Sequence, residues 1–205
     1  MNVTAEEFFN KRQWFYGMKK RTKDEVVYFV NDKSKCILSA PHAIKLGEKL
    51  SEPASISHVS ILAELAKSNS IYKINEGNNF NDKLKELITK GNLKFLLDFH
   101  SMDAKRKELV CVGTGNGLLL NTDSKKRHFK KLLKIMKANN VDVSVDYPFA
   151  ADTPHALAYH FGQDPNLFAL QLEINSKLGT AEYNKELNAS LDAMTKFIYY
   201  LDYER

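Results

Sequence analysis

The chain has 205 residues, enough to form one domain with a substantial core. Hydrophobic residues make up 43% of it and charged residues 27%, which is the balance of a soluble globular protein. No apolar stretch approaches the length of a membrane span, and the N-terminus lacks the basic flank and apolar run of a secretory signal. We therefore expect a cytoplasmic protein with no membrane partner.

The formal net charge of +5 raises the question of nucleic-acid binding. Positive charge is densest from Ser124 to Lys137, where apolar residues recur at helical spacing and predict an amphipathic helix with its lysines in solvent. A nucleic-acid surface over Lys125 to Lys137 is the alternative, but no recognition module accompanies it. We expect no nucleic-acid partner, and the sequence leaves the oligomeric state open.

The first half of the chain alternates between strand and helix signals. Thr4 and Glu7 resemble a capping box that opens a first helix. Two strands, expected over 26–30 and 36–40, are joined by a turn-rich link. Ser51 and Pro53 are typical of a helix start, and this helix should run through Leu65. A strand over 71–74 and a helix over 81–89 follow.

The second half continues this alternation. Strands are expected over 95–99, 109–112, 141–145 and 167–174, and helices over 123–139, 152–161 and 180–201. No repeat or Pro/Gly-rich linker divides the chain, so residues 1–205 should form a single domain. Strands that alternate with helices predict a three-layer α/β/α sandwich around a largely buried sheet, although the strand order cannot be read from the sequence. Cys36 and Cys111 lie in apolar runs and are expected in the core as free thiols.

Three apolar runs of strand length contain or end in polar side chains that can bind a metal or move a proton. They are Cys36-Ile-Leu-Ser-Ala-Pro-His42, Phe95-Leu-Leu-Asp-Phe-His100 and Phe168-Ala-Leu-Gln-Leu-Glu-Ile-Asn175. In an open α/β sheet, polar groups at the C-terminal ends of strands meet in one crevice, where ligands usually bind. Two histidines and a glutamate in such positions indicate a hydrolytic metal site.

His42 and His100 are the candidate metal ligands. A neutral imidazole held on rigid backbone is a good zinc ligand. Asp98 precedes His100 by two positions, so both side chains leave the same face of the strand, and the carboxylate can orient the imidazole ring. The alternatives are a turn histidine bonded to backbone for His42 and a structural Asp–His pair for His100.

A zinc hydrolase typically has three protein ligands, with water in the fourth position. Glu52, at the start of the helix after His42, is the favoured third ligand. Its other interpretation is a first-turn glutamate that interacts with the helix dipole. Glu48 is a rival on spacing and His58 a weaker one.

Glu173 interrupts a strand whose neighbours are apolar. An unpaired buried carboxylate is costly, so Glu173 needs a partner, a raised pKa or a pocket. A general base requires such a perturbed environment. The alternative is a glutamate in a structural ion pair.

Together these segments resemble the N-formylglutamate amidohydrolase family, within the wider set of zinc carboxypeptidase-like hydrolases. The matching pieces occur in the family's order between about residues 36 and 178. They are Ser39-Ala-Pro-His42, Ser51-Glu-Pro53, Leu97-Asp-Phe-His-Ser101, Val112-Gly113, Asp146-Tyr-Pro-Phe149 and Leu170-Gln-Leu-Glu-Ile-Asn175. The resemblance implies a zinc-exopeptidase/phosphorylase-hydrolase-like fold with a mixed central sheet.

By position, the resemblance also implies one zinc ion held by His42, Glu52 and His100, with Glu173 as general base. The chain departs from the family at two points. Carboxypeptidase-like relatives place the glutamate three residues after the first histidine, where this chain has Lys45. Formylglutamate-type members carry an Asn-Arg pair in the middle region, where this chain has Asn75-Glu-Gly-Asn-Asn79.

An arginine is the usual partner of a substrate carboxylate, and Arg106 is the candidate replacement, with a solvated loop charge as the alternative. Five further residues are candidates for substrate contacts or for support of the ligands. They are Asp98, Ser101, Tyr147, His155 and Asn175.

The sequence therefore predicts a zinc-dependent amide hydrolase that acts on a small N-acyl amino acid or a short peptide. Another divalent metal such as manganese, iron or cobalt also suits two histidines and a carboxylate. A non-catalytic binding protein that keeps the hydrolase fold is the main alternative, and a nucleic-acid-associated basic protein is the second.

Overall fold

The computed structural model describes residues 2–8, 10–11, 25–42, 52–75 and 77–203. Residues 5–8, 10 and 11 are helical. The strands that follow are β1 (Val26–Phe29), β2 (Cys36–Ala40), β3 (Asn69–Lys73), β4 (Phe95–Met102), β5 (Val110–Gly113), β6 (Val143–Val145) and β7 (Phe168–Asn175). The longer helices are α2 (Pro53–Ala66), α3 (Phe80–Lys90), α4 (Asp123–Ala138), α5 (Leu157–Gly162) and α6 (Asn184–Tyr203).

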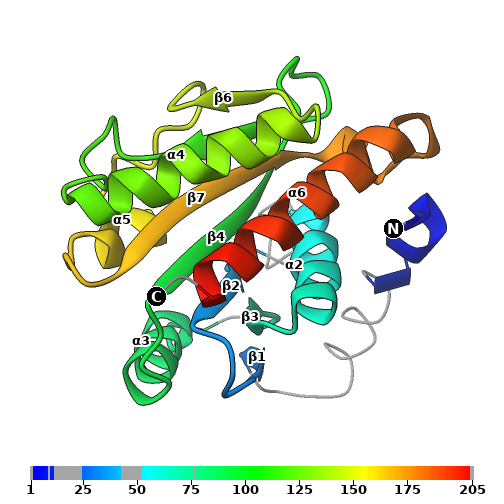
Figure 1. The fold of residues 1–205 in the computed structure, drawn as a ribbon. Helices are drawn as coiled ribbons and strands as arrows, with labels where there is room; N and C mark the ends of the chain where they lie inside the picture. The colour runs from blue at the N-terminus through cyan, green and yellow to red at the C-terminus, as the bar shows by residue number, and fades with distance from the viewer. Residues whose placement is uncertain (1, 9, 12–24, 43–51, 76, 204–205) are drawn as a thin grey trace.

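The seven strands of the described chain form one mixed sheet in the order β1-β3-β2-β4-β7-β5-β6. β1 is antiparallel to β3 and β5 is antiparallel to β7, whereas the other neighbours run parallel. Helices α2, α4 and α6 cover one face, and α3 and α5 cover the other (Figure 1). The expected three-layer α/β/α sandwich with a mixed, largely buried sheet is confirmed.

Alternation along β7 shows how the sheet separates its two faces. Phe168, Leu170, Leu172 and Ile174 belong to the core under α2, α4 and α6. Ala169 belongs to the smaller core on the α3 and α5 side. Gln171 and Glu173 follow at the next positions of that same side, so the apolar packing there gives way to polar side chains toward the strand's C-terminal end.

The basic helix α4 forms as expected, but one of its lysines does not lie in solvent. Thr122 caps the helix by accepting a hydrogen bond from the backbone N–H of Lys125 at 3.2 Å. The Lys125 side chain is buried, and its Nζ donates to the carbonyl oxygens of Gly162 and Asp164 at 2.7 and 2.8 Å. Lys125 therefore ties α4 to the end of α5 and leaves the solvated basic face smaller than the sequence predicts.

Several element boundaries differ from the predicted ones. β4 continues to Met102 and β7 to Asn175, because the two strands pair over their full lengths. The helix expected over 152–161 begins only at Leu157, after an extended Ala156, and β6 begins at Val143. Both cysteines are buried free thiols, as expected.

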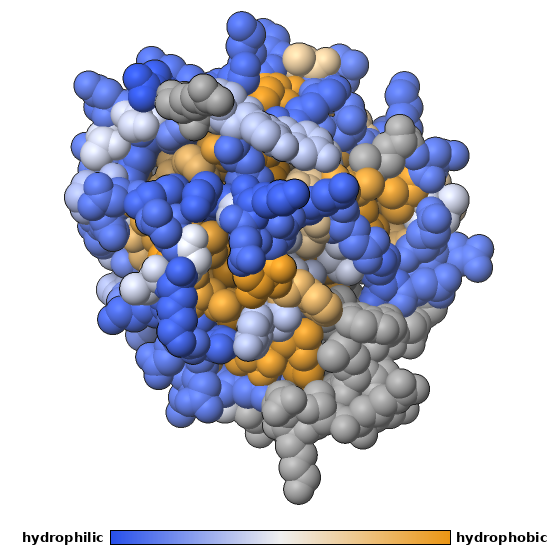
Figure 2. All heavy atoms as spheres, turned by 60° about the horizontal axis from the view of Figure 1, so that its bottom comes forward, coloured by the Kyte–Doolittle hydropathy of each residue, from blue (hydrophilic) through white to orange (hydrophobic). Residues whose placement is uncertain are grey.

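Apolar residues reach the surface near the β1 edge of the sheet. Tyr28, Phe29 and Val30 are exposed by 43%, 48% and 56%. Figure 2, which turns the bottom of Figure 1 toward the viewer, shows apolar areas between polar side chains on that face. Of the described helices, none combines the length and apolar character needed to cross a bilayer.

Candidate metal centre

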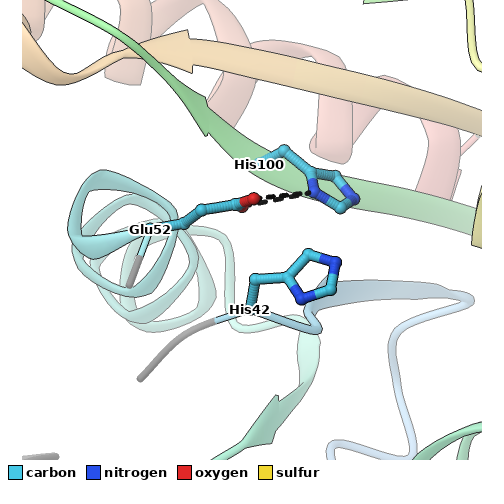
Figure 3. Close-up of side chains that lie close together, drawn as sticks. All are labelled: His42, Glu52 and His100. Atoms are coloured by element: carbon cyan, nitrogen blue, oxygen red, sulfur yellow. Dashed lines mark hydrogen bonds and ion pairs between the residues drawn. The ribbon is translucent and has the colours of Figure 1, made fainter. Parts of the chain in front are cut away.

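His42, Glu52 and His100 come together from three separate elements. His42 lies two residues beyond β2, Glu52 is the N-cap of α2, and His100 lies inside β4. One ligand atom from each residue lies within 4.8 Å of the others, and the side chains face a common space (Figure 3). The predicted set is therefore assembled, whereas Glu48 lies outside the described residues.

His100 presents its two ring nitrogens to different carboxylates. Nδ1 lies 3.2 Å from Oε2 of Glu52, and Nε2 lies 3.0 Å from Oδ2 of Asp98. The other Asp98 oxygen accepts a hydrogen bond from Oγ of Ser39 at 2.6 Å. This arrangement directs Nδ1 toward the ligand cluster, and Nε2–H donates to a carboxylate that orients the ring.

Electrostatics favour a positive charge at this position. Burial acts to lower the pKa of His100, but the nearby Asp98 and Glu52 carboxylates outweigh it and raise that pKa well above the usual value. A bound cation would replace the imidazole proton between the same carboxylates. The site therefore stabilises either a proton or a metal ion, and the two compete.

His42 and Glu52 are linked through their backbones. The N–H of Glu52 donates to the carbonyl oxygen of His42 at 3.0 Å. The His42 ring is exposed, and its centroid lies 5.2 Å from that of His100. Two imidazoles and one carboxylate are a donor set typical of catalytic zinc, so the residues present fit the metal that the sequence implies.

Glu173 lies beside the cluster, in register with His100 across the β4–β7 pair. Its side of the sheet also carries Cys111, the Glu173 partner on β5. The carboxylate accepts a hydrogen bond from Nε2 of Gln171 at 2.7 Å. Burial raises the pKa of Glu173 to about 7, so at neutral pH the group can both accept and return a proton.

His58 does not join the cluster. Its ring is fully buried in α2, with Nδ1 3.0 Å from the carbonyl oxygen of Ala54 and an edge-to-face contact with Phe8. Burial lowers the pKa of His58 to about 4. His58, the weaker of the two rival ligands, is therefore a core residue.

Two of the predicted supporting residues contact the ligands. Asp98 bonds His100, and Ser101 bonds Glu52 through its backbone N–H at 3.1 Å. Asn175 uses its amide group within the chain, because Nδ2 donates to the carbonyl oxygens of Arg106 and Glu108. It therefore holds the loop after β4.

Arg106, Tyr147 and His155 are exposed. The guanidinium of Arg106 lies over the ring of Phe149, with Cζ 5.0 Å from the ring centroid. The carbonyl oxygens of Tyr147 and Phe149 accept weak hydrogen bonds from the Cys111 thiol. His155 lies in the turn before α5 and is not one of the three clustered ligand residues.

The sequence interpretation missed Ser39, Ser55 and Gln171. Ser39 and Gln171 share the strand face of Asp98 and Glu173, and polar side chains at alternate positions of otherwise apolar strands were the available signal. Ser55 gave no such signal, because its role depends on the approach of β4. A cavity of about 770 Å³ lies elsewhere, lined in part by Ser60, Ser70 and Tyr72, and includes none of the candidate ligands.

Neither a protein-family model nor a curated protein matches the sequence. Solved structures do match the fold. The gene product Atu2144 from Agrobacterium tumefaciens superposes with a TM-score of 0.63 at 12% identity, over 92% of this chain and 98% of that chain. The N-formylglutamate amidohydrolase from Ralstonia eutropha JMP134 gives a TM-score of 0.56 at 10% identity, over 87% and 97%.

A metallo-carboxypeptidase from Pseudomonas aeruginosa gives a TM-score of 0.56 at 9% identity, over 93% of this chain and 68% of that one. The chain thus has the fold shared by these amidohydrolase and carboxypeptidase structures. At such identities the likeness concerns the fold, and the chemistry has to be argued from the residues of the site.

Proposed function

We propose that this protein is a zinc-dependent hydrolase that cleaves the amide bond of a small N-acyl amino acid or a short peptide. The observation that carries the proposal is the position of Glu173 directly beside the His42, Glu52 and His100 cluster. A three-residue donor set next to a buried carboxylate combines the two functions that metal-assisted hydrolysis needs.

His42, Glu52 and His100 would hold the metal ion. When bound, zinc supplies a Lewis acid that polarises a carbonyl group and acidifies water. Another divalent ion suits the same donors and is distinguished by analysis of the purified protein. Asp98 keeps the His100 ring oriented, with Ser39 holding the second oxygen of that carboxylate.

Glu173 accepts the proton of the attacking water and returns it to the leaving nitrogen. Its raised pKa suits both steps at neutral pH. The hydrogen bond from Gln171 occupies Oε1, which leaves Oε2 to receive the proton. Because Glu173 lies inside a central strand, its carboxylate is aimed by rigid backbone.

The substrate side is assigned to the segment that follows β4 and to the segment between β6 and α5. Arg106 is proposed to contact a substrate carboxylate, since its guanidinium donates no hydrogen bond to any described residue. Its stacking partner Phe149 adjoins Cys111, which neighbours Glu173. Tyr147 and His155 are proposed as exposed parts of the same wall.

The proposal is tested by the metal content and activity of purified wild type beside two variants. About one zinc ion per chain is expected in the wild type and in His160→Ala, which changes an exposed histidine on α5. His100→Ala should lose the metal and the hydrolysis of N-acyl amino acids or peptides. Wild-type protein that neither contains nor takes up a divalent metal would contradict the proposal and favour a binding protein.

A further inference from the structure

Glu52 occupies an unusual place for a metal ligand. It lies ten positions after His42, and a backbone hydrogen bond between the two residues, rather than short sequence spacing, brings them together. It is also the N-cap of α2, yet its side chain makes no capping hydrogen bond to its own helix. An N-cap carboxylate ordinarily accepts a bond from a backbone N–H of the first turn.

A residue of β4, Ser101, provides the hydrogen-bond acceptor for the first turn of α2 in place of Glu52. Its Oγ accepts a hydrogen bond at 2.8 Å from the N–H of Ser55, the third residue of the helix. The same N–H also lies 3.1 Å from the carbonyl oxygen of Glu52. A serine on β4 thus caps α2, and the Glu52 carboxylate is left to turn toward His100.

Ser101 also binds Glu52 directly. Its backbone N–H donates to Oε2 of Glu52 at 3.1 Å, the oxygen that lies 3.2 Å from Nδ1 of His100. The Ser55 hydroxyl group in turn donates a hydrogen bond to the carbonyl oxygen of Glu52, with Oγ 2.6 Å from that oxygen. The candidate ligand is therefore held at its side chain, its carbonyl group and its helix.

Neighbouring residues of β4 divide these tasks, because successive side chains of a strand point to opposite faces. His100 presents its ring to the cluster, and Ser101 turns its hydroxyl toward the start of α2. The same part of β4 therefore positions His100 and, through Ser101, holds Glu52 in place. Ordering a ligand before the metal arrives reduces the entropy that binding must overcome.

We infer that Ser101 is a positioning residue for Glu52 and that its hydroxyl sets the metal affinity of the site by capping α2 from β4. This inference rests on the proposed metal-dependent function. It assigns the effect to the Oγ–Ser55 bond, since the backbone bond to Glu52 survives substitution of the side chain.

The test compares Ser101→Ala with Ser101→Thr and Thr122→Ala. Thr122 caps α4 by the same kind of bond, far from the cluster, so its loss is the matched control for a missing helix cap. The zinc dissociation constant of each full-length protein is measured by competition with a chromophoric chelator. Urea unfolding of the metal-free proteins gives their stabilities.

Ser101→Ala should weaken zinc binding by about 10-fold or more, as expected for loss of an outer-sphere partner. Ser101→Thr keeps the hydroxyl and should keep the affinity. Thr122→Ala should lower stability and leave the affinity unchanged. If Ser101→Ala does not fold, Ser101→Cys, whose sulfur is a weak acceptor, should show an intermediate loss of affinity.

Equal zinc affinities of Ser101→Ala (or of Ser101→Cys) and the wild type would overturn the inference and reduce Ser101 to a helix cap, with the proposed function intact. A wild type that binds no metal would overturn both, so the two failures are distinguishable.

Discussion

Glu173 and His100 lie directly opposite each other on neighbouring parallel strands at the centre of the sheet. Their separation is therefore set by the β4–β7 ladder, which pairs eight residues on each strand. A proton-accepting carboxylate and a metal-binding imidazole held in this way need no loop movement to meet.

Glu173→Gln should abolish most of the catalysis and keep the metal. The amide cannot accept a proton, so the rate should fall by about 10²–10⁴-fold, the usual contribution of a general base. The measurement is kcat beside zinc content, with the exposed Glu182→Gln as control. A variant that retains wild-type kcat would show that another group accepts the proton.

The same carboxyl group should make the stability of the metal-free protein depend on pH. Burial raises the pKa of Glu173 from 4.5 to about 7, so the folded state holds this proton more tightly than the unfolded state does. Its contribution to stability is largest below pH 4.5, decreases as the pH rises to 7, and is constant above that.

Glu173→Gln lacks this titration. At pH 8 it should be more stable than the wild type by up to about 3 kcal/mol, the free energy that corresponds to the pKa shift, whereas near pH 4 the two should differ little. Urea unfolding of the metal-free proteins at both pH values gives the comparison. A difference that is the same at both would show that Glu173 titrates normally.

Asp98→Asn should weaken metal binding without removing a metal ligand. The Asp98 carboxylate accepts bonds from both Ser39 and His100, and an amide, with one oxygen, can accept only one of them. The zinc dissociation constant should rise by about 10–100-fold.

Asp146→Asn is the matched control for Asp98→Asn. Asp146 accepts two hydrogen bonds from Thr114 and does not contact the metal ligands. Chelator competition on the three proteins decides the matter. An equal loss of zinc affinity in Asp98→Asn and Asp146→Asn would indicate a general effect on folding.

Residues of the candidate site such as His100 and Glu173 can be predicted from the sequence because the pattern that marks them is local. His100 and Glu173 stand out as ionisable side chains within apolar strands, and the sheet brings such positions together. The hydroxyl and amide partners are harder to predict. Ser55 acquires its role from Ser101, a residue on a different element, and nothing in its own neighbourhood indicates this contact.

The burial of Lys125 also depends on tertiary contacts that the local sequence does not indicate. Helical spacing places it among solvated lysines, but its aliphatic chain is buried and its ammonium group is satisfied by two carbonyl oxygens near the end of α5. The late start of α5 also has a tertiary cause. The carbonyl oxygen of Ala150 accepts a bond from the N–H of Gly115, and Ala151 has a φ of 56°, so the chain is not helical there.

His58 should be a source of acid sensitivity separate from the metal centre. Burial lowers its pKa from 6.5 to about 4, although its bond to the Ala54 carbonyl opposes this shift. The unfolded state therefore takes up a proton at a pH where the folded state does not. The free energy of unfolding should therefore be unaffected by the titration of His58 above pH 6.5 and should decrease as the pH falls from 6.5 toward 4.

His58→Leu removes this titration and fills the same apolar site under Phe8. Between pH 7 and pH 4 the free energy of unfolding should fall by up to about 3 kcal/mol less in the variant than in the wild type. His160→Leu, at an exposed position, should follow the wild type. The measurement is urea unfolding of the metal-free proteins across this range. Parallel pH profiles for wild type and His58→Leu would contradict this prediction, because they would mean that His58 takes up its proton at the same pH in the folded and unfolded states.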